Sequence, residues 1–190
     1  MSADSLDAIA VGKGPGSYTG LRVGVSTAKG LCMALHKPLL AFGSLEALAW
    51  QVRDLAQHLK ADICPLIDAR RMEVYCARYD ASGRELNPPQ AEILSPDAFV
   101  AWQSERRLLL PGDGAAKAAS LFADTDQVWV MPEIQASAAY LGPRLMAAWQ
   151  AGETEDLVSF EPYYLKDFVA TRPRSLLQQI GRPDGTTPGD

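Results

Sequence analysis

Cysteine and histidine are scarce in this chain, with three of the first and two of the second among 190 residues. The cysteines Cys32, Cys64 and Cys76 form no CxxC motif, and their odd number argues against a disulfide framework. We therefore expect reduced, buried or half-buried thiols in a cytoplasmic protein. No apolar run approaches the roughly 20 residues that span a bilayer, and the first residues lack the basic and apolar stretches of a signal peptide. We expect no membrane association.

A basic surface is also missing from the sequence. Lysine and arginine total 18 against 23 aspartates and glutamates, which gives a net charge of -5. A protein that binds RNA by itself is expected to cluster basic residues on one face or along one helix. The composition therefore predicts that any contact with RNA runs through a partner.

Short apolar strand patterns alternate with helical patterns, which predicts an α/β fold. Strands are expected at residues 8–11, 39–42, 63–67, 72–79, 108–110 and 128–130. Helices are expected at residues 21–35, 44–60, 96–103, from 115 onward, and at 136–151, where Gly142 and Pro143 should kink or divide the helix. Residues 92–94 are expected to pair back on 72–79 as a hairpin, so the sheet should be mixed.

The segment between the first strand and the first helix is rich in glycine. It contains Gly12, Lys13, Gly14, Pro15, Gly16, Ser17, Tyr18, Thr19 and Gly20. It is no Walker A loop, and Thr19 stands where the dinucleotide-binding GxGxxG fingerprint needs its third glycine. Backbone amides at such a strand-to-helix turn can bind an anion. Spacing alone leaves this interpretation and a tight turn without a ligand both open.

The helix expected at residues 21–35 has two stripes that avoid charge. One contains Leu21, Val25, Ala28, Cys32 and Leu35, and the second contains Val23, Ser26, Thr27, Gly30 and Ala34. A surface helix is normally charged opposite its core face, and Gly30 costs about 1 kcal/mol relative to alanine in a helix interior. The pattern predicts cover on both sides, by a second helix of this chain or by another subunit.

Four segments resemble one known family. GKGPGSYTGLRVGVSTAKGL at residues 12–31 closely resembles the signature of the TsaB (YeaZ) family of the actin-like ATPase superfamily, which is grouped with the M22 glycoprotease-like peptidases. Three later segments resemble further motifs of the same family: IDARRMEVYCARY at 67–79, PGDGA at 111–115 and EPYYLKDF at 161–168. The first signature is highly specific, and the resemblance runs up to Phe168.

The resemblance implies an actin-like (RNase H-like) two-lobe fold with mixed sheets. We expect a first lobe through residue 61, a second lobe over residues 62–170 and a flexible tail over 171–190. The family normally begins with a strand carrying an Asp-x-Thr/Ser phosphate motif, two more strands and a helix, and this sequence starts after them. The first lobe is thus expected to be truncated, with an unpaired sheet edge. A fragment, a misassigned start and a gap filled by another chain are the three explanations left open.

The family resemblance also implies a function. Members act as non-catalytic subunits of the complex that installs threonylcarbamoyl on the tRNA adenosine next to the anticodon. A catalytic paralogue (TsaD-like) transfers the group from an adenylate, and an ATPase subunit (TsaE-like) completes the complex; a homodimer is left open. The implied partner surface is formed by Arg22, Val23, Ser26, Thr27, Gly30 and Ala34. No cofactor is required, and ATP or ADP is left open at the glycine-rich loop.

An enzyme is the alternative, either an actin-like ATPase or phosphotransferase or a metalloprotease-like protein. The catalytic paralogue holds its metal with closely spaced histidines, whereas His36 and His58 fall on different expected helices. Ser17 is not in a GxSxG motif. Asp68, Arg70 and Glu73 could form a charged cluster at a strand end, but a turn aspartate with ion-paired neighbours is the favoured interpretation. Asp113, between two glycines, is interpreted as a turn residue; a position in a cleft between the lobes, where it would meet a nucleotide, is the less favoured alternative. We expect no catalytic residue and no metal site.

Overall fold

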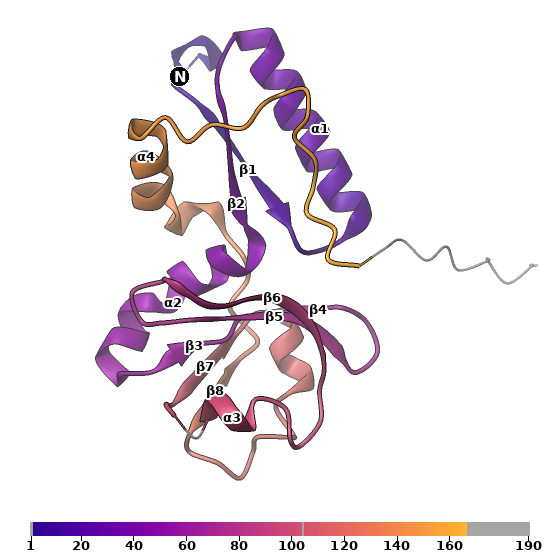
Figure 1. Ribbon diagram of the computed structural model, residues 1–190, viewed down its shortest axis with the longest axis vertical. Helices are drawn as coiled ribbons and strands as arrows, with labels where there is room; N and C mark the ends of the chain where they lie inside the picture. Colours follow the sequence, from indigo (N-terminus) through magenta and orange to yellow (C-terminus); the bar gives the residue numbers. More distant parts are fainter. Residues whose placement is uncertain (1, 104, 167–190) are drawn as a thin grey trace, which may run out of the picture.

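The structure is a computed structural model that describes residues 2–103 and 105–166. It has two lobes, each with its own sheet, and they lie one above the other in Figure 1. The first lobe contains two parallel strands, β1 (Ile9–Gly14) and β2 (Leu39–Gly43). The second contains six strands with parallel and antiparallel pairs, which confirms the expected mixed α/β class. The flexible tail expected at residues 171–190 lies outside the described residues.

Helix α1 (Tyr18–Leu35) follows β1 and covers one face of the small sheet (Figure 1). Ser17 caps its start, because its hydroxyl accepts a hydrogen bond from the Gly20 amide at 3.3 Å. His36 ends it in a left-handed conformation, with φ at 51°. The buried residues of α1 are Val25, Ala28 and Cys32. A 3₁₀ turn, η1 (Ala3–Ser5), precedes β1.

The last described part of the chain returns to the first lobe. After the 3₁₀ turn η3 (Ala138–Tyr140), helix α4 (Gly142–Gln150) packs beside β2. The Glu155 amide donates to the Leu39 carbonyl at 2.8 Å, and Phe160 packs in the same buried cluster as α1. Gly142 divides the expected helix at residues 136–151, as the Gly-Pro pair predicts.

The lobes therefore divide the chain differently from the expected boundary at residue 61. Helix α2 (Ser44–Leu59), assigned above to the first lobe, packs its apolar face on the larger sheet. The segment 141–166, assigned above to the second lobe, packs on the first sheet. The reason is that these contacts join residues far apart in sequence, which local apolar periodicity does not register.

The larger sheet has the strand order β4-β5-β3-β7-β8. Strands β3 and β4 pair with successive parts of the same edge of β5, and β6 pairs with its opposite edge. The strands are β3 (Asp62–Ile63), β4 (Leu66–Asp68), β5 (Glu73–Tyr79), β6 (Glu85–Ile93), β7 (Leu108–Pro111) and β8 (Val128–Met131). The pairing of residues 92–94 with β5 is largely confirmed, but β6 is much longer than expected. Pro88 and Pro89 obscure it in the sequence, and an edge strand tolerates them because its outer side needs no hydrogen-bonded partner.

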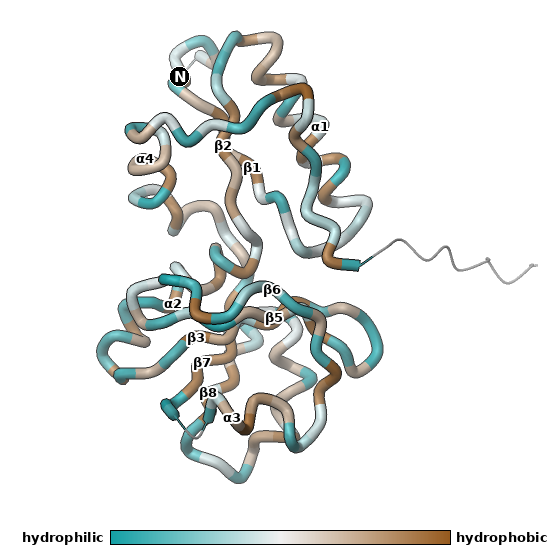
Figure 2. The backbone as a smooth tube through the Cα atoms, viewed as in Figure 1, coloured by the Kyte–Doolittle hydropathy of each residue, from teal (hydrophilic) through white to brown (hydrophobic). Residues whose placement is uncertain are grey.

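Helix α2 covers one side of this sheet, and a buried cluster with two short helices, α3 (Val100–Gln103) and η2 (Asp113–Lys117), lies on the other. Hydrophobic residues follow the central strands, and hydrophilic ones gather in the outer loops (Figure 2). The helix expected from residue 115 is only the 3₁₀ turn η2. A Cβ on Gly114 would lie 2.9 Å from the Ile67 carbonyl carbon, so this turn packs directly on the β4 backbone.

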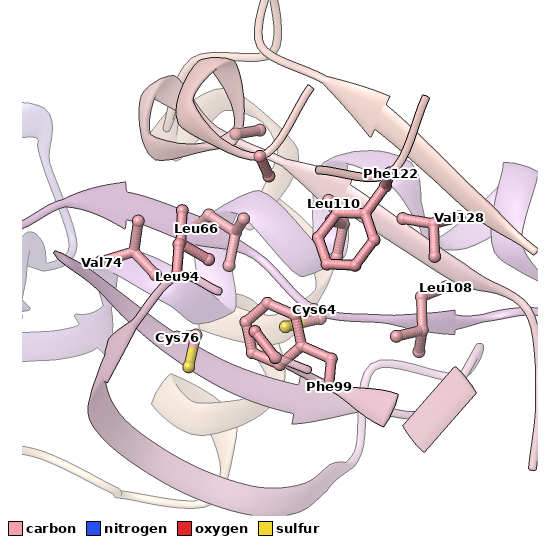
Figure 3. Close-up of a cluster of buried hydrophobic side chains, with 13 residues drawn as sticks. Cys64, Leu66, Val74, Cys76, Leu94, Phe99, Leu108, Leu110, Phe122 and Val128 are labelled. Atoms are coloured by element: carbon pink, nitrogen blue, oxygen red, sulfur yellow. The ribbon is translucent and has the colours of Figure 1, made fainter. Parts of the chain in front are cut away.

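All three cysteines are buried and free of disulfide bonds, as expected from their number and spacing. Cys64 and Cys76 lie in the cluster that also contains Phe99, Leu110 and Phe122 (Figure 3). Burial, followed by its neighbour Cys76, raises the pKa of the Cys64 thiol well above its ordinary value. Cys64 is therefore a protonated core side chain, without the thiolate character that a nucleophile needs.

The turn between β5 and β6 is organised by Asp80. Its Oδ1 accepts hydrogen bonds from the Ser82 amide at 2.8 Å and the Ser82 hydroxyl at 2.6 Å, and from the Arg84 amide at 3.1 Å. Burial opposes ionisation, but these hydrogen bonds and that from the Arg84 side chain outweigh it and lower the pKa of Asp80.

We predict that this carboxylate stabilises the fold at pH 7 and loses that effect in acid. Because its folded-state pKa is lowered, its contribution is complete above about pH 4, the ordinary Asp pKa, and is lost as the pH falls through the folded value. Urea unfolding at pH 7 and pH 3 should show a smaller acid loss for Asp80→Asn than for the wild type. Asp124→Asn, which changes an exposed carboxylate with no hydrogen bond among the described residues, is the control. Equal acid losses in all three proteins would contradict the prediction.

Candidate functional site

The glycine-rich loop joins β1 to α1 at the side of the first lobe that faces the second (Figure 1). Gly14 has φ at +115°, which L side chains rarely adopt. A Cβ there would lie 2.7 Å from the Tyr163 carbonyl oxygen. The Tyr163 amide donates to the Lys13 carbonyl at 2.7 Å, so the described part of the family motif at residues 161–168, called the closing motif below, lies directly on this loop. Gly14 is thus explained by a contact within the chain.

We predict that Gly14→Ala lowers the free energy of unfolding by about 2–4 kcal/mol, because it adds backbone strain to a clash with backbone atoms. Gly16→Ala is the matched control, since a Cβ there meets nothing within 4 Å. It should change stability by less than about 0.5 kcal/mol. Urea denaturation of both variants measures the difference, and similar values for the two would contradict the close contact with Tyr163.

A cavity of about 220 Å³ lies between the lobes beside this loop. Gly16, Ser17 and Gly20 line one side, and Ser44, Asp113 and Gln135 are among the residues that line the rest. Its volume is below the roughly 300–1,000 Å³ of typical small-molecule sites. No lysine or arginine is among its described lining residues, and Asp113 places a carboxylate there. Binding of ATP or ADP at this loop stays a prediction, and the described walls offer a phosphate uncharged donors, namely backbone amides, hydroxyls and the Gln135 side-chain amide.

The charged residues at the edge of this cavity bond to one another. Asp113 Oδ1 accepts from the Asp68 amide at 3.0 Å, and Asp68 Oδ1 accepts from Lys117 Nζ at 2.6 Å. Burial opposes ionisation of Asp68, but the hydrogen bonds from Lys117 and from the Arg70 amide outweigh it and lower its pKa. The arrangement ties the end of β4, where Asp68 lies, to η2, whose first residue is Asp113. Asp113 also lines the cavity between the lobes.

The two histidines lie far from any such cluster. His36 ends α1, and His58 is exposed near the end of α2. Within residues 2–103 and 105–166, His, Cys, Asp and Glu side chains form no group of three that could hold a metal ion. The Ser17 hydroxyl caps α1, and no histidine contacts it within the described residues.

The outer face of α1 is open. All six residues implied as a partner surface are exposed, and we call them the α1 face: Arg22, Val23, Ser26, Thr27, Gly30 and Ala34. Val23 is 61% exposed, and a Cβ on Gly30 would meet nothing within 4 Å. Among residues 2–103 and 105–166, no second helix covers these residues, and their assignment to a subunit interface stays a prediction.

The basic side chains next to the α1 face make contacts at its borders. Lys29 Nζ donates to the carbonyl oxygens of Phe160 at 2.9 Å and Val158 at 3.4 Å, so its charge is directed toward the closing segment. At the start of the helix, Arg22 donates to the Tyr18 hydroxyl at 3.3 Å. The Tyr18 ring in turn lies 5.0 Å from the Tyr164 ring. Arg22 is thus the one charged member of the α1 face.

Sequence reasoning missed two features of this region. Met33 is 68% exposed and adjoins the α1 face, although its apolar character suggests burial. Tyr163 and Tyr164 connect the closing motif to the loop and to α1. The only sequence signal for the second feature is the family motif itself, because no local pattern links residues about 150 positions apart.

Solved structures with the same architecture identify its class. YeaZ from Pseudomonas aeruginosa matches with a TM-score of 0.68 and 26% sequence identity, over 86% of this chain and 76% of that one. The fold is therefore the actin-like two-lobe α/β fold that the sequence motifs imply.

The family follows from the sequence comparisons. The family model described as TsaD, tRNA N6-adenosine threonylcarbamoyltransferase, matches residues 1–178, so the chain belongs to that family. The tRNA threonylcarbamoyladenosine biosynthesis protein TsaB of Bacillus subtilis is 37% identical over 115 residues, 59% of this chain and 48% of that protein. TsaB of Escherichia coli is 34% identical over 101 residues, 50% of this chain and 42% of that protein. These relatives place the chain with the TsaB (YeaZ) members.

The matched relatives are longer than the part they share with this chain, which spans about half the length of the Bacillus protein. Within the described residues, none of the helices combines the length and the apolar character that crossing a membrane requires.

Proposed function

We propose that the chain is a non-catalytic scaffold or activator subunit of the cytoplasmic machinery that installs threonylcarbamoyl on tRNA adenosine next to the anticodon. It pairs with a catalytic paralogue of the TsaD kind, and an ATPase subunit of the TsaE kind joins the complex. It reaches tRNA through that complex and needs no cofactor of its own. The names of its TsaB relatives support the pathway.

The α1 face carries the structural part of this proposal. A helix that is buried on one side and lined with small, mostly uncharged residues on the other can approach another helix closely. Ser26, Thr27 and Gly30 provide the short side chains, while Val23 and the neighbouring Met33 provide apolar surface. Depletion of charge at the centre of a patch is what distinguishes interface cores from ordinary surface.

A homodimer through the α1 face is the competing assembly when the paralogue is absent.

The catalytic alternatives have less support. An ATPase or phosphotransferase would need cations and a metal-holding acid close together near the glycine-rich loop, and the described lining of the smaller cavity offers the carboxylate of Asp113 without a lysine or arginine. A metalloprotease would need closely spaced ligands, which the described residues do not bring together.

Reconstitution of tRNA modification tests the role. The chain, the paralogue and the ATPase subunit are combined with unmodified tRNA and threonylcarbamoyl adenylate, and modified adenosine is measured by mass spectrometry. We expect product only when chain and paralogue are both present, and none with the chain alone. Product from the chain alone would make it an enzyme. Full activity of the other two proteins without it would remove the activator role.

A further inference from the structure

A second and larger cavity lies between the lobes, on the side of the glycine-rich loop where β6 passes below the ends of β1 and β2 (Figure 1). Its volume is about 390 Å³, within the roughly 300–1,000 Å³ of small-molecule sites. It shares only Pro15 with the smaller cavity. The first lobe contributes Lys13 and Gly43 to its lining, and β5 and β6 contribute Tyr79, Glu85 and Pro89.

The hydroxyl of Tyr79 makes no hydrogen bond with any described residue. The Tyr79 residue is only 4% exposed and lines this cavity, and its oxygen is not among the buried polar atoms without a partner, so it is accessible from the cavity. A hydroxyl in this position can bind water or a ligand. Burial, with help from the nearby Glu85 and Glu46 carboxylates, raises the Tyr79 pKa, so the hydroxyl keeps its proton and can donate.

Two opposite charges face the same space without pairing. Lys13 is half-buried on β1 and Glu85 is exposed on the edge strand β6, and neither side chain makes a hydrogen bond or ion pair among the described residues. The third ionised group, Glu46, is already used: its oxygens accept from the Gly43 amide at 3.1 Å and from Arg144 at 3.2 Å. The free groups are therefore one ammonium, one carboxylate and one hydroxyl donor.

We propose that this cavity binds a small zwitterion, a free amino acid or a close analogue. The ligand carboxylate is held by Lys13 and the Tyr79 hydroxyl, and the ligand ammonium by Glu85. Charge-assisted hydrogen bonds of this kind are the strong ones. Leu45, Pro15 and Pro89 form apolar walls that suit an aliphatic side chain. A ligand here would touch both lobes and hold them in a fixed relation.

Titration of the full chain with three probes, followed by NMR shifts of backbone amides, tests the charge pattern. L-leucine carries both charges, leucinamide lacks the carboxylate, and N-acetyl-leucine lacks the ammonium. We expect saturable shifts around Gly14, Gly43 and Gly83 with L-leucine, and binding weaker by about tenfold or more for each of the other two. Equal affinity for all three, or no saturable shift with any, would overturn the proposal.

Three variants locate the site. Lys13→Met, Tyr79→Phe and Glu85→Gln should each weaken L-leucine binding by about fivefold or more. Lys13→Met should reduce the difference in affinity between L-leucine and leucinamide. Glu85→Gln should reduce the difference in affinity between L-leucine and N-acetyl-leucine. Tyr75→Phe, on the same strand but outside the cavity lining, is the matched control and should bind as the wild type does. Unchanged binding in all three variants would place the ligand elsewhere and overturn the assignment. The proposal is independent of partner binding, because it concerns the chain alone.

Discussion

Replacing Arg78 by methionine is expected to lower the free energy of unfolding by about 3–5 kcal/mol, because the buried Asp62 carboxylate loses its hydrogen-bonded partner and keeps only Arg106, whose Nη1 lies 3.8 Å away. Arg78 is 7% exposed and Asp62 is 2% exposed. The guanidinium donates twice to Asp62 Oδ2, from Nε at 2.9 Å and from Nη2 at 2.7 Å. It also donates to Glu105 at 2.6 Å and lies 5.9 Å from the centre of the Trp102 ring.

A double variant that also replaces Asp62 identifies the cause of this loss of stability. If the loss comes from the Asp62 carboxylate that no longer has its hydrogen-bonded partner, the double variant Arg78→Met with Asp62→Leu should regain much of the stability, since apolar replacements of a buried ion pair are often neutral or stabilising. Lys60→Met, at an exposed helix end, is a control for loss of a surface cation. Urea denaturation of the four proteins gives the coupling. A loss below about 1 kcal/mol for Arg78→Met would show that water reaches and solvates Asp62.

Placing leucine at Gly30 is expected to weaken binding of the catalytic paralogue by about thirtyfold or more, equal to about 2 kcal/mol. The reason is steric: a helix that approaches this face closely at glycine has no room for four added carbons. Inside the chain the side chain meets open space. The free energy of unfolding should even rise, because glycine costs about 1 kcal/mol relative to alanine in a helix.

Ala147→Leu is the control, because Ala147 is also exposed and helical but lies on α4, outside the α1 face. It should leave the affinity for the paralogue unchanged. Ser26→Trp, one turn away on the α1 face, should act as Gly30→Leu does. Affinities can be measured by isothermal titration calorimetry. Wild-type affinity for both α1 variants would move the interface to another surface.

Much of α1 could be predicted from the sequence because a helix shows its two faces in local periodicity. Val25 and Cys32 are buried, Ser26 and Thr27 are exposed, and the start and end signals lie within a few residues of the observed ends. The family motifs supplied the two-lobe fold, which periodicity alone would have left as a mixed α/β class. Assignment of the α1 face to a partner remains a prediction.

Contacts between distant segments could not be predicted. Nothing local in the sequence links Tyr163 to Gly14, or Glu155 to Leu39, and these contacts change the lobe boundaries. The ion pair between Asp62 and Arg78 depends on adjacent strands of the sheet, so neither residue is recognisable alone as buried. The larger cavity could not be predicted for the same reason, since Lys13 and Glu85 line one cavity only because the two lobes face each other.

The central claim, that the chain is the scaffold partner of a catalytic paralogue, is tested most directly by mixing the two purified proteins from the same source. Gel filtration with light scattering gives the mass of each species. We expect one species with the summed mass of one copy of each protein, and we expect this complex to disappear when Gly30 is replaced by leucine. Separate elution of the two proteins at concentrations well above those of the tRNA modification assay would contradict it.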